Sequence, residues 1–353
     1  MVAPDVVYYG YVGNFGLAEA GRANALALQW AGLRVARNEA NGRGLANGME
    51  NYAPVVIHHW HPDSSAKKQK IFSDKIRPGK RVAFWVWECE HALNPYFHEY
   101  AEYFDEIWTA SHYSARLFEP LGKPVRVFEH ALRFHSGAPE GRGAKFRVLL
   151  SFDVWSRASR KNPLAAIQAF KKAFPLRSHG NCELTLKVNH LSQQDRNRLM
   201  DNADDPRVVI HDEFLSESEL QKLFMRHHCV LSLHRSEGFG LNLARATAYG
   251  IPLVATNYGG NVEWMAPDFA VNWEPCEITE PDFYPLGGWW AEPDVEHAAK
   301  QLRAVYDDPA RATAAAQKAA GAWDFSLDTL SRKFASVLEA PNFQMQPSSL
   351  QLA

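Results

Sequence analysis

The most constraining feature of the chain is a run in which a carboxylate and two glycines stand between an apolar strand and a helix. Glu237 follows a strand predicted over 230–233, and Gly238 and Gly240 remove side chains from the turn before a helix predicted over 241–249. Unpaired N–H groups at the start of a helix attract anions. The turn is therefore a candidate phosphate site.

A second predicted strand leads to the same place. It covers residues 252–256 and is followed by Gly259 and Gly260. In an open parallel sheet, ligands bind beyond the carboxyl ends of the strands. We therefore expect the two glycine loops to meet at one edge of the sheet.

The length and the pattern of the chain indicate an α/β protein with two domains. The chain has 353 residues, enough for two ordinary domains, and short apolar strands alternate with helical patterns in both halves. A stretch rich in glycine and small residues lies between the halves and is typical of a linker. The predicted limits are a first domain over 1–134, a linker over 135–145, a second domain over 146–325, a C-terminal helix over 326–340 and a loose tail over 341–353.

Composition excludes several other classes of protein. No apolar run approaches the roughly 20 residues that a membrane helix needs, and the chain opens without a secretory signal. We therefore expect a cytoplasmic protein, either free or bound peripherally at the membrane. The four cysteines, which we interpret as buried thiols, lie too far apart for a zinc knuckle; they are Cys89, Cys182, Cys229 and Cys276.

The charge is balanced overall but uneven along the chain. A formal net charge of −2 gives no general attraction for nucleic acid. One basic stretch over 67–81 is either a solvated loop or a surface for an anionic acceptor, such as a lipid-linked phosphate, an acidic glycan or nucleic acid. Its cations are Lys67, Lys68, Lys70, Lys75, Arg77, Lys80 and Arg81.

Two further loops have the composition of phosphate sites. Near the N-terminus, Gly13 and Gly16 lie between a strand and a helix, but neither a third glycine nor an acidic residue closing the second strand completes a dinucleotide fingerprint. In the second half, Ser156 and three cations lie between a strand and a helix that starts at a proline, where fixed cations would neutralise phosphate. These cations are Arg157, Arg160 and Lys161.

Together these blocks resemble the GT-B glycosyltransferases, specifically the retaining family 4 type (glycosyl transferases group 1). The family signature is a Glu, seven residues and a second Glu; Glu237 matches the first, whereas Arg245 replaces the second. The resemblance implies two doubly wound Rossmann-like domains that face a central cleft, with a last helix that returns to the first domain. It also implies a nucleotide-sugar donor as co-substrate, with neither a cofactor nor a metal.

The resemblance also implies roles for individual residues. Glu237 would contact hydroxyls of the transferred sugar, and Lys161 would stabilise the departing diphosphate together with Arg157 or Arg160, between which the sequence does not decide. An arginine at 245 offers only donors where ribose hydroxyls usually meet an acceptor, which suggests an unusual donor or nucleotide pose. The implied donor-binding residues are Gly16, Ser156, Gly238, Phe239, Gly240, Leu241, Arg245, Gly259 and Gly260.

Candidates for the acceptor lie in the first half. Glu88, Glu90 and His91 follow an apolar strand and could contact or deprotonate an acceptor hydroxyl, and His59 could reach the transferred sugar. The run of residues 58–61 contains three histidines, but a strand turns alternate side chains to opposite faces, so a metal site is not expected there.

The sequence thus predicts an enzyme that transfers a sugar to an acceptor hydroxyl with retention of configuration. The acceptor would be a glycan, a lipid-linked molecule or another hydroxyl compound. Two alternatives use the same donor site: a nucleic-acid base glycosyltransferase that binds its acceptor through 67–81, and a non-catalytic binder of nucleotide sugars, suggested by Arg245. A Rossmann oxidoreductase fits less well.

Overall fold

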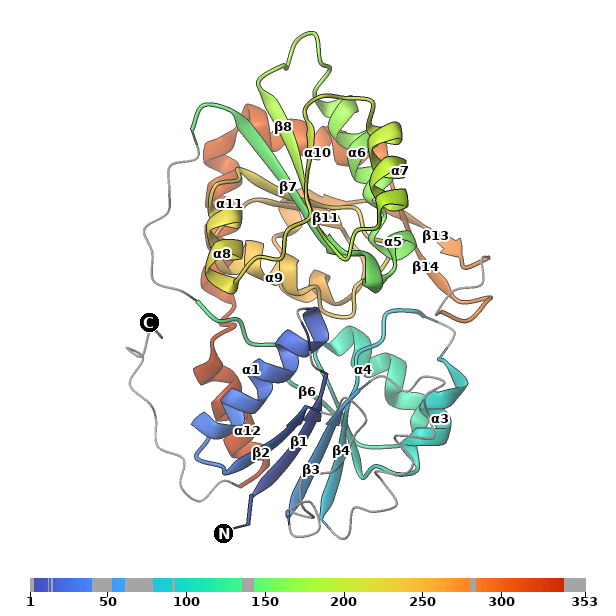
Figure 1. The fold of residues 1–353 in the computed structure, drawn as a ribbon, viewed down its shortest axis with the longest axis vertical. Helices are drawn as coiled ribbons and strands as arrows, with labels where there is room; N and C mark the ends of the chain where they lie inside the picture. The colour runs from blue at the N-terminus through green and yellow to red at the C-terminus, as the bar shows by residue number, and fades with distance from the viewer. Residues whose placement is uncertain are drawn as a thin grey trace. The chain divides into compact units, whose positions relative to one another are not determined.

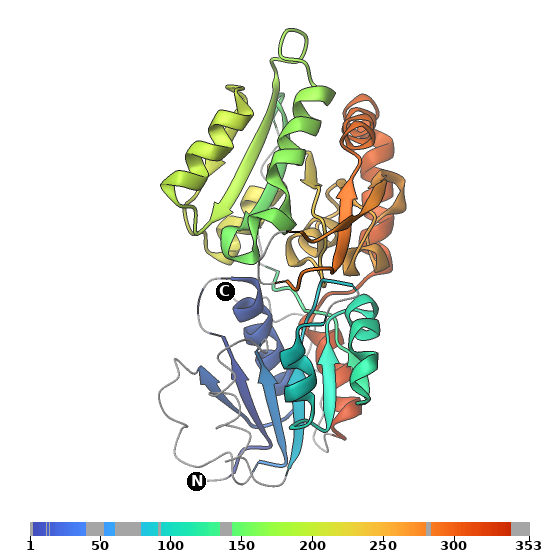
Figure 2. The same ribbon diagram turned by 90° about the vertical axis from the view of Figure 1, so that its right-hand side faces the viewer.

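The computed structural model describes residues 3–11, 13, 15–39, 53–60, 79–90, 93–134, 143–279 and 284–339. The chain forms two compact units. Of the described residues, the first unit contains those up to Arg133, those between Ile278 and Gly288, and those from Phe325 to Glu339; the second contains those within 134–277 and 289–324. The predicted α/β class with two doubly wound sheets is confirmed (Figures 1 and 2).

The first unit is built on a parallel sheet of six strands in the order β2-β1-β3-β4-β5-β6. The chain passes from β1 to one neighbour and then to the other, so the strand order reverses between β1 and β3. The strands are β1 (Val6–Gly10), β2 (Val35–Glu39), β3 (Val55–His59), β4 (Lys80–Phe84), β5 (Glu106–Thr109) and β6 (Val125–Val127).

Four α-helices of the first unit lie within the described residues. Helix α1 packs against both β1 and α12, and α4 packs against β5 and β6. The aromatic core includes the buried side chains of Trp85 and Trp108, the second of which stacks with Phe334 of α12. The helices are α1 (Gly16–Trp30), α3 (Pro95–Ala101), α4 (His112–Phe118) and α12 (Leu327–Val337).

The second unit is built on another parallel sheet of six strands, in the order β12-β11-β10-β7-β8-β9. Here the strand order reverses between β7 and β10. A separate antiparallel pair, β13 (Trp273–Glu277) and β14 (Trp289–Pro293), follows the sheet. The strands of the sheet are β7 (Phe146–Asp153), β8 (Cys182–Asn189), β9 (Val208–His211), β10 (Cys229–Ser232), β11 (Leu253–Thr256) and β12 (Ala270–Val271).

The helices of the second unit enclose a continuous apolar core. Helix α6 packs against α7 and α10, and α9 packs against α11. Strand β10, which packs against α6, is buried along its whole length, as expected for a central strand of a parallel sheet covered on both faces. The helices are α5 (Ala158–Lys161), α6 (Pro163–Ala173), α7 (Gln193–Ala203), α8 (Glu217–Met225), α9 (Leu241–Ala248), α10 (Val295–Asp307) and α11 (Pro309–Ala322).

Two expectations from the sequence are wrong. We predicted no acidic residue at the end of the second strand, but the second strand is β2, which ends at Glu39. This edge strand has only two apolar residues, so no apolar run predicts it. We also interpreted all four cysteines as buried, whereas Cys276 is partly exposed because it lies on the two-stranded β13–β14 pair.

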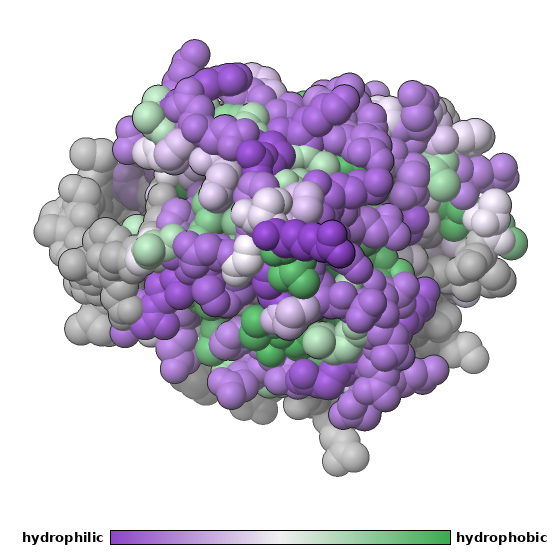
Figure 3. Space-filling view, turned by 90° about the horizontal axis from the view of Figure 1, so that it is seen from above, coloured by the Kyte–Doolittle hydropathy of each residue, from purple (hydrophilic) through white to green (hydrophobic). Residues whose placement is uncertain are grey.

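The predicted domain limits stay predictions. Most of the predicted linker and the whole tail over 341–353 lie outside the described residues. Within the part of the chain that the structure describes, no helix is both long and apolar enough to cross a bilayer. On the face shown in Figure 3, hydrophilic side chains predominate, and the hydrophobic ones form small separate patches.

Candidate functional site

The candidate site lies where the strand order of the second sheet reverses. Strand β7 leads into the loop that carries Arg160 and Lys161, and β10 leads into the loop that carries Glu237. Because β7 and β10 are neighbours, the two loops leave the sheet side by side. Open α/β sheets bind ligands at this kind of position.

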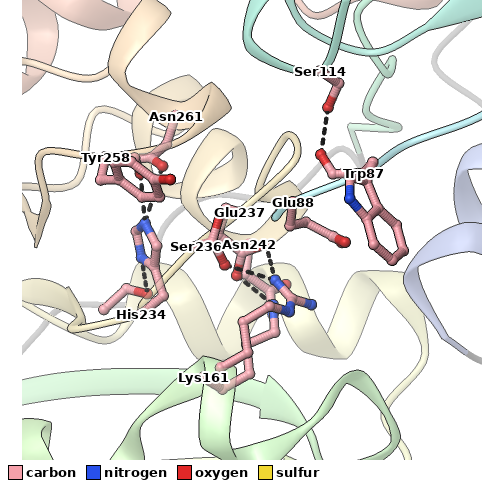
Figure 4. Close-up of polar contacts among 12 residues, drawn as sticks. Trp87, Glu88, Ser114, Lys161, His234, Ser236, Glu237, Asn242, Tyr258 and Asn261 are labelled. Carbon is pink, nitrogen blue, oxygen red and sulfur yellow. Dashed lines mark hydrogen bonds and ion pairs between the residues drawn. The ribbon is translucent and has the colours of Figure 1, made fainter. Parts of the chain in front are cut away.

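Glu237 is the centre of a buried ionic cluster. Its side chain is nearly inaccessible, with 5% of the residue exposed, and one carboxylate oxygen pairs with Nζ of Lys161 (Figure 4). The other oxygen accepts a hydrogen bond of 3.1 Å from Arg160, which also donates to the Ser236 carbonyl at 2.7 Å. A buried carboxylate requires such partners, because desolvation of an unpaired charge is costly.

The cations determine the charge state of Glu237. Burial by itself raises the pKa of this carboxyl, but Lys161 and Arg160 outweigh that effect, and the pKa is lowered to about 2. The group is therefore a carboxylate at neutral pH. It can accept hydrogen bonds from hydroxyls, but it has no proton to donate.

The structure separates the two arginines that the sequence left as alternatives. Arg160 is buried and contacts Glu237, whereas Arg157 is exposed and has a positive φ of 68°. The backbone N–H of Arg235 donates to the Arg160 carbonyl at 2.7 Å, and its guanidinium donates to the Ser159 carbonyl. Arg235 is thus a supporting residue that the sequence did not reveal. Ser156 closes the short 3-10 turn before Arg157 and is partly exposed.

Three glycines, Gly240, Gly259 and Gly260, shape the backbone around Glu237. Gly240 precedes α9 with a φ of 84°, and its carbonyl accepts from the N–H groups of Leu243 and Ala244. Gly259 has a φ of 94°, and a Cβ placed there would lie 2.5 Å from the Glu237 carbonyl oxygen. The next residue, Gly260, donates its N–H to that same oxygen at 2.8 Å. The two glycine loops therefore do meet around Glu237.

A buried histidine in the loop after β10 hydrogen-bonds with residues of the loop after β11. Nδ1 of His234 shares a hydrogen bond with the Ser232 hydroxyl. Its Nε2 lies 3.1 Å from the Tyr258 carbonyl oxygen and 3.0 Å from the Asn261 side-chain oxygen (Figure 4). Both partners of Nε2 are acceptors, which assigns the proton to that nitrogen. Burial lowers the pKa of His234, so the ring is neutral. This positioning role was not predicted.

Arg245 lies in the second turn of α9 and is buried, with 6% of the residue exposed. Its guanidinium donates to the Asn242 side-chain oxygen at 2.8 Å, and Asn242 in turn donates to Ser151 at the end of β7. Of the other predicted donor residues, Phe239 is buried against Trp264, while Gly238 and Leu241 belong to the same loop and helix start.

The first unit has its own polar cluster at the point where its strand order reverses. On β3, His59 is 1% exposed, and its Nδ1 lies 2.7 Å from the Tyr8 hydroxyl on β1. That hydroxyl also accepts from Asn24 of α1 at 3.1 Å. Gly16 begins α1, and Arg22 in the same helix donates to the Gly13 carbonyl at 2.7 Å.

Glu88, a predicted acceptor residue, is held from three directions. The Tyr284 hydroxyl donates to its carboxylate at 3.1 Å, and the Tyr113 hydroxyl donates to its backbone carbonyl at 2.9 Å. The preceding carbonyl, of Trp87, accepts from Ser114 (Figure 4). Glu90 is partly buried nearby in the chain, whereas His91 lies outside the described residues. No local pattern indicates Tyr284, which lies 196 residues from Glu88 along the chain.

Two further expectations concern metals and anionic acceptors. Within the described residues, no group of three or more His, Cys, Asp or Glu side chains could hold a metal ion. Of the basic stretch over 67–81, only Gly79, Lys80 and Arg81 are described. Lys80 pairs with Glu106 at 2.8 Å, and Arg81 lies 3.8 Å from Asp105. The remaining cations of the stretch lie outside the described residues.

Comparison with known proteins identifies the fold. The structure of the pneumococcal O-GlcNAc transferase GtfA in complex with UDP and GlcNAc has a TM-score of 0.62 at 13% identity, over 82% of this chain and 57% of that chain. Sucrose-phosphate synthase from Thermosynechococcus elongatus has a TM-score of 0.71 at 12% identity, over 95% and 98%. WaaG, a glycosyltransferase involved in lipopolysaccharide biosynthesis, has a TM-score of 0.63 at 14% identity, over 94% and 98%.

These likenesses show the GT-B fold, and the chain spans little more than half the length of GtfA. No curated protein sequence matches the chain significantly. Residues 152–321, just under half of the chain, match the family model for glycosyl transferases group 1. Residues 152–321 are therefore similar to group 1 glycosyltransferases, and the chain as a whole has the GT-B fold.

Proposed function

We propose that this protein transfers a sugar from a nucleotide-sugar donor to an acceptor hydroxyl with retention of the anomeric configuration. The observation that carries the proposal is the buried cluster of Glu237 with Lys161 and Arg160 at the strand-order reversal of the second sheet. The cluster unites two cations for a diphosphate with one carboxylate for sugar hydroxyls. The start of α9 after Gly240 adds backbone N–H groups for the same anion.

In the proposed reaction, the bond between the anomeric carbon and the diphosphate oxygen breaks, and the new bond to the acceptor oxygen forms on the same face. The acceptor proton passes to the departing diphosphate. Lys161 and Arg160 stabilise the charge that develops on that leaving group, because they are already oriented when it forms. Fixed cations supply this stabilisation from the protein itself, so we expect transfer to continue in the presence of EDTA.

Glu237 is assigned to the hydroxyls of the transferred sugar. Its two carboxylate oxygens are engaged by cations, which makes it a weak nucleophile, and its pKa of about 2 leaves it without a proton. These properties favour an acceptor of hydrogen bonds over a group that forms a covalent intermediate. A donor that binds here competes with Glu237 for the two cations.

Arg245 modifies the donor site. It stands where the resemblance places a ribose-binding carboxylate, and it is tied to Asn242 at the start of α9. Because a guanidinium only donates hydrogen bonds, ribose hydroxyls can meet it only as acceptors. We assign to this site a donor that presents acceptor atoms or an additional anionic group to Arg245.

The acceptor is assigned to the first unit. Glu88 has a carboxylate oxygen fixed by Tyr284, which suits it to receive a hydrogen bond from an acceptor hydroxyl. A glycan or a lipid-linked sugar offers such hydroxyls. The chemistry of Glu88 specifies a hydroxyl, and several classes of molecule carry one.

The test is the isosteric substitution Glu237→Gln. It removes the charge that neutralises Lys161 and Arg160, so both cations become available to phosphate. We expect the rate of sugar transfer to fall by a factor of about ten to a hundred, while UDP, GDP or ADP, whichever the wild-type protein binds, binds more tightly. Titration calorimetry and a transfer assay with panels of nucleotide sugars and sugar acceptors measure both effects.

The outcome separates function from folding. A variant with unchanged thermal stability, weaker transfer and tighter nucleotide binding supports the assignment. Undiminished transfer in Glu237→Gln contradicts it. The anomeric configuration of the product, read from its NMR coupling constant, tests retention independently: an inverted product rejects the same-face mechanism.

A further inference from the structure

A tryptophan with an open face lies in the loop that also carries the candidate phosphate-binding cations. Trp155 is 68% exposed, the largest exposure among the large hydrophobic side chains of the described residues. Its indole stacks on the His190 ring with 3.4 Å between ring centroids and 11° between ring planes. One face of the indole is therefore covered by a flat polar ring, while much of the remaining side chain meets solvent.

This aromatic pair is held rigidly by one carboxylate. Asp153, the last residue of β7, accepts from the backbone N–H of Trp155 at 2.9 Å. Its two oxygens also lie 2.9 Å and 3.0 Å from Nδ1 of His190, which follows the end of β8. Asp153 thus fixes the start of the Trp155 turn and the ring that backs the indole.

The local backbone is shaped for the same arrangement. His190 has a φ of 55°, a conformation that non-glycine residues adopt only where the surroundings impose it. The edge of its ring meets Phe214, which follows β9 and is 53% exposed. Three strand ends, those of β7, β8 and β9, therefore contribute to one aromatic surface.

Polar groups border this surface. Lys187 on β8 is buried and donates to the Asn189 side-chain oxygen at 2.5 Å. It is close enough to Asp153, Asp212 and Glu213 for their charges to raise its pKa against the larger, opposite effect of burial.

We propose that Trp155, backed by His190, is the stacking platform for the nucleobase of the donor. The proposal rests on the proposed function, since it assigns the base of the same nucleotide whose diphosphate meets Lys161. Trp155 precedes Lys161 by six residues in the segment that follows β7, so a ligand that stacks a base on Trp155 and meets Lys161 carries both an aromatic ring and a diphosphate. A nucleoside diphosphate has that composition.

The experiment compares ligands with and without a base. Titration calorimetry measures UDP, GDP, ADP and inorganic pyrophosphate against the wild-type protein, Trp155→Ala and Trp155→Phe. Loss of one base–aromatic stack weakens binding by a factor of about five to a hundred. We expect this loss in Trp155→Ala for the tightest-binding nucleoside diphosphate, with most of the affinity kept in Trp155→Phe and no change for pyrophosphate.

A matched control is Trp289→Ala, which removes another partly exposed tryptophan, from β14. It should bind every probe as the wild-type protein does. Nucleoside diphosphate binding that is unchanged in Trp155→Ala overturns the platform, as does an equal loss for pyrophosphate. If the wild-type protein binds none of the nucleoside diphosphates, the proposed function fails as well, so the two failures are distinguishable.

Discussion

The two units place different chemistry at the same topological position. In the second unit, the strand-order reversal between β7 and β10 holds a buried carboxylate with two cations, centred on Glu237. In the first unit, the reversal between β1 and β3 holds Tyr8 and His59, joined by a hydrogen bond of 2.7 Å. One site is ionic, and the other consists of hydroxyl, amide and imidazole groups.

Burial, together with neighbouring charges, explains the charge state of each site. In the first unit, desolvation raises the pKa of Tyr8 and lowers the pKa of His58 and of His130 to about 3, so these groups stay neutral. In the second unit, desolvation of Glu237 is opposed by cations in direct contact, and the charge persists. A diphosphate is stabilised by fixed positive charge, whereas a hydroxyl can bind neutral groups as well as carboxylates, so the two cations favour the donor in the second unit.

The largest expected effect comes from removing a cation of the ionic site. Lys161→Ala takes away a charge that stabilises the leaving diphosphate, and loss of one preorganised donor of this kind lowers kcat by a factor of about a hundred to a thousand. A steady-state transfer assay measures it. Lys172→Ala, which removes an exposed ion pair with Glu296 in the same unit, should leave kcat unchanged.

A matching substitution in the first unit serves as the control for Lys161→Ala. Tyr8→Phe removes two hydrogen bonds from the neutral site of the first unit and should leave nucleotide affinity as it is. If Tyr8→Phe weakened nucleotide binding as much as Lys161→Ala does, the division of donor and acceptor chemistry between the units would be wrong.

The next effect concerns the loop that surrounds Glu237. Gly259→Ala combines a positive φ of 94° with a Cβ 2.5 Å from a carbonyl oxygen and 3.0 Å from the Glu237 nitrogen. In Gly122→Ala, φ is 66° and nothing lies within 4 Å of the new Cβ, so only backbone strain remains. We expect Gly259→Ala to lose at least about 2 kcal/mol more unfolding free energy than Gly122→Ala in urea titrations. Equal losses would show that the close approach of the two loops is relaxed in solution.

The sequence predicts the second unit well because its elements carry strong local signals. Helix α9 begins at Leu241 after the glycine turn as expected, and α6 begins at Pro163. Short runs of mainly apolar residues mark buried strands such as β10 and β11. The first unit is harder, because α3 and α4 have only seven residues each and β2 is a half-polar edge strand, and none of these was predicted.

The candidate site shows the same division. Lys161 and Glu237 are named from local composition, each next to a strand end, and the parallel sheet brings them together. The choice between Arg157 and Arg160 depends on which side chain turns inward, and the sequence contains no signal for that. Contacts between residues that are distant in the chain also leave no local pattern in the sequence. The stack of Trp155 on His190 joins two loops, and Tyr284 contacts Glu88 from the segment between β13 and β14.

A smaller effect tests how burial keeps His58 of the first unit uncharged. Burial, followed by the charge of Arg81, lowers the pKa of His58 from 6.5 to about 3, and its Nε2 has no hydrogen-bond partner among the described residues. Below pH 6.5, His58 binds a proton in the unfolded chain but not in the folded state. The free energy of unfolding therefore falls as the pH decreases toward 3. At pH 5 this histidine costs about 2 kcal/mol.

His58→Phe removes that cost and keeps a flat ring against Tyr9, with which His58 stacks at 4.9 Å. We expect the variant to be stabilised, and more so at pH 5 than at pH 7.5, when the free energy of unfolding is measured at both. His98→Gln, an exposed site on α3, is the control. A pH dependence identical to that of the wild-type protein would mean that the pKa of His58 is the same in the folded and the unfolded state.

The smallest effect separates acceptor from donor within the proposed reaction. Tyr284→Phe keeps the ring packed against Trp87 at 5.2 Å but removes the hydrogen bond that fixes the Glu88 carboxylate. A hydrogen bond of this strength corresponds to a change of about fivefold to tenfold. We expect KM for the acceptor to rise by that factor, while kcat and the nucleotide Kd stay constant. Tyr113→Phe loosens only the Glu88 backbone carbonyl and should raise KM less. A rise in nucleotide Kd in Tyr284→Phe would instead assign Glu88 to donor binding and remove the distinction between the two units, because a carboxylate of the first unit would then serve the ligand assigned to the second.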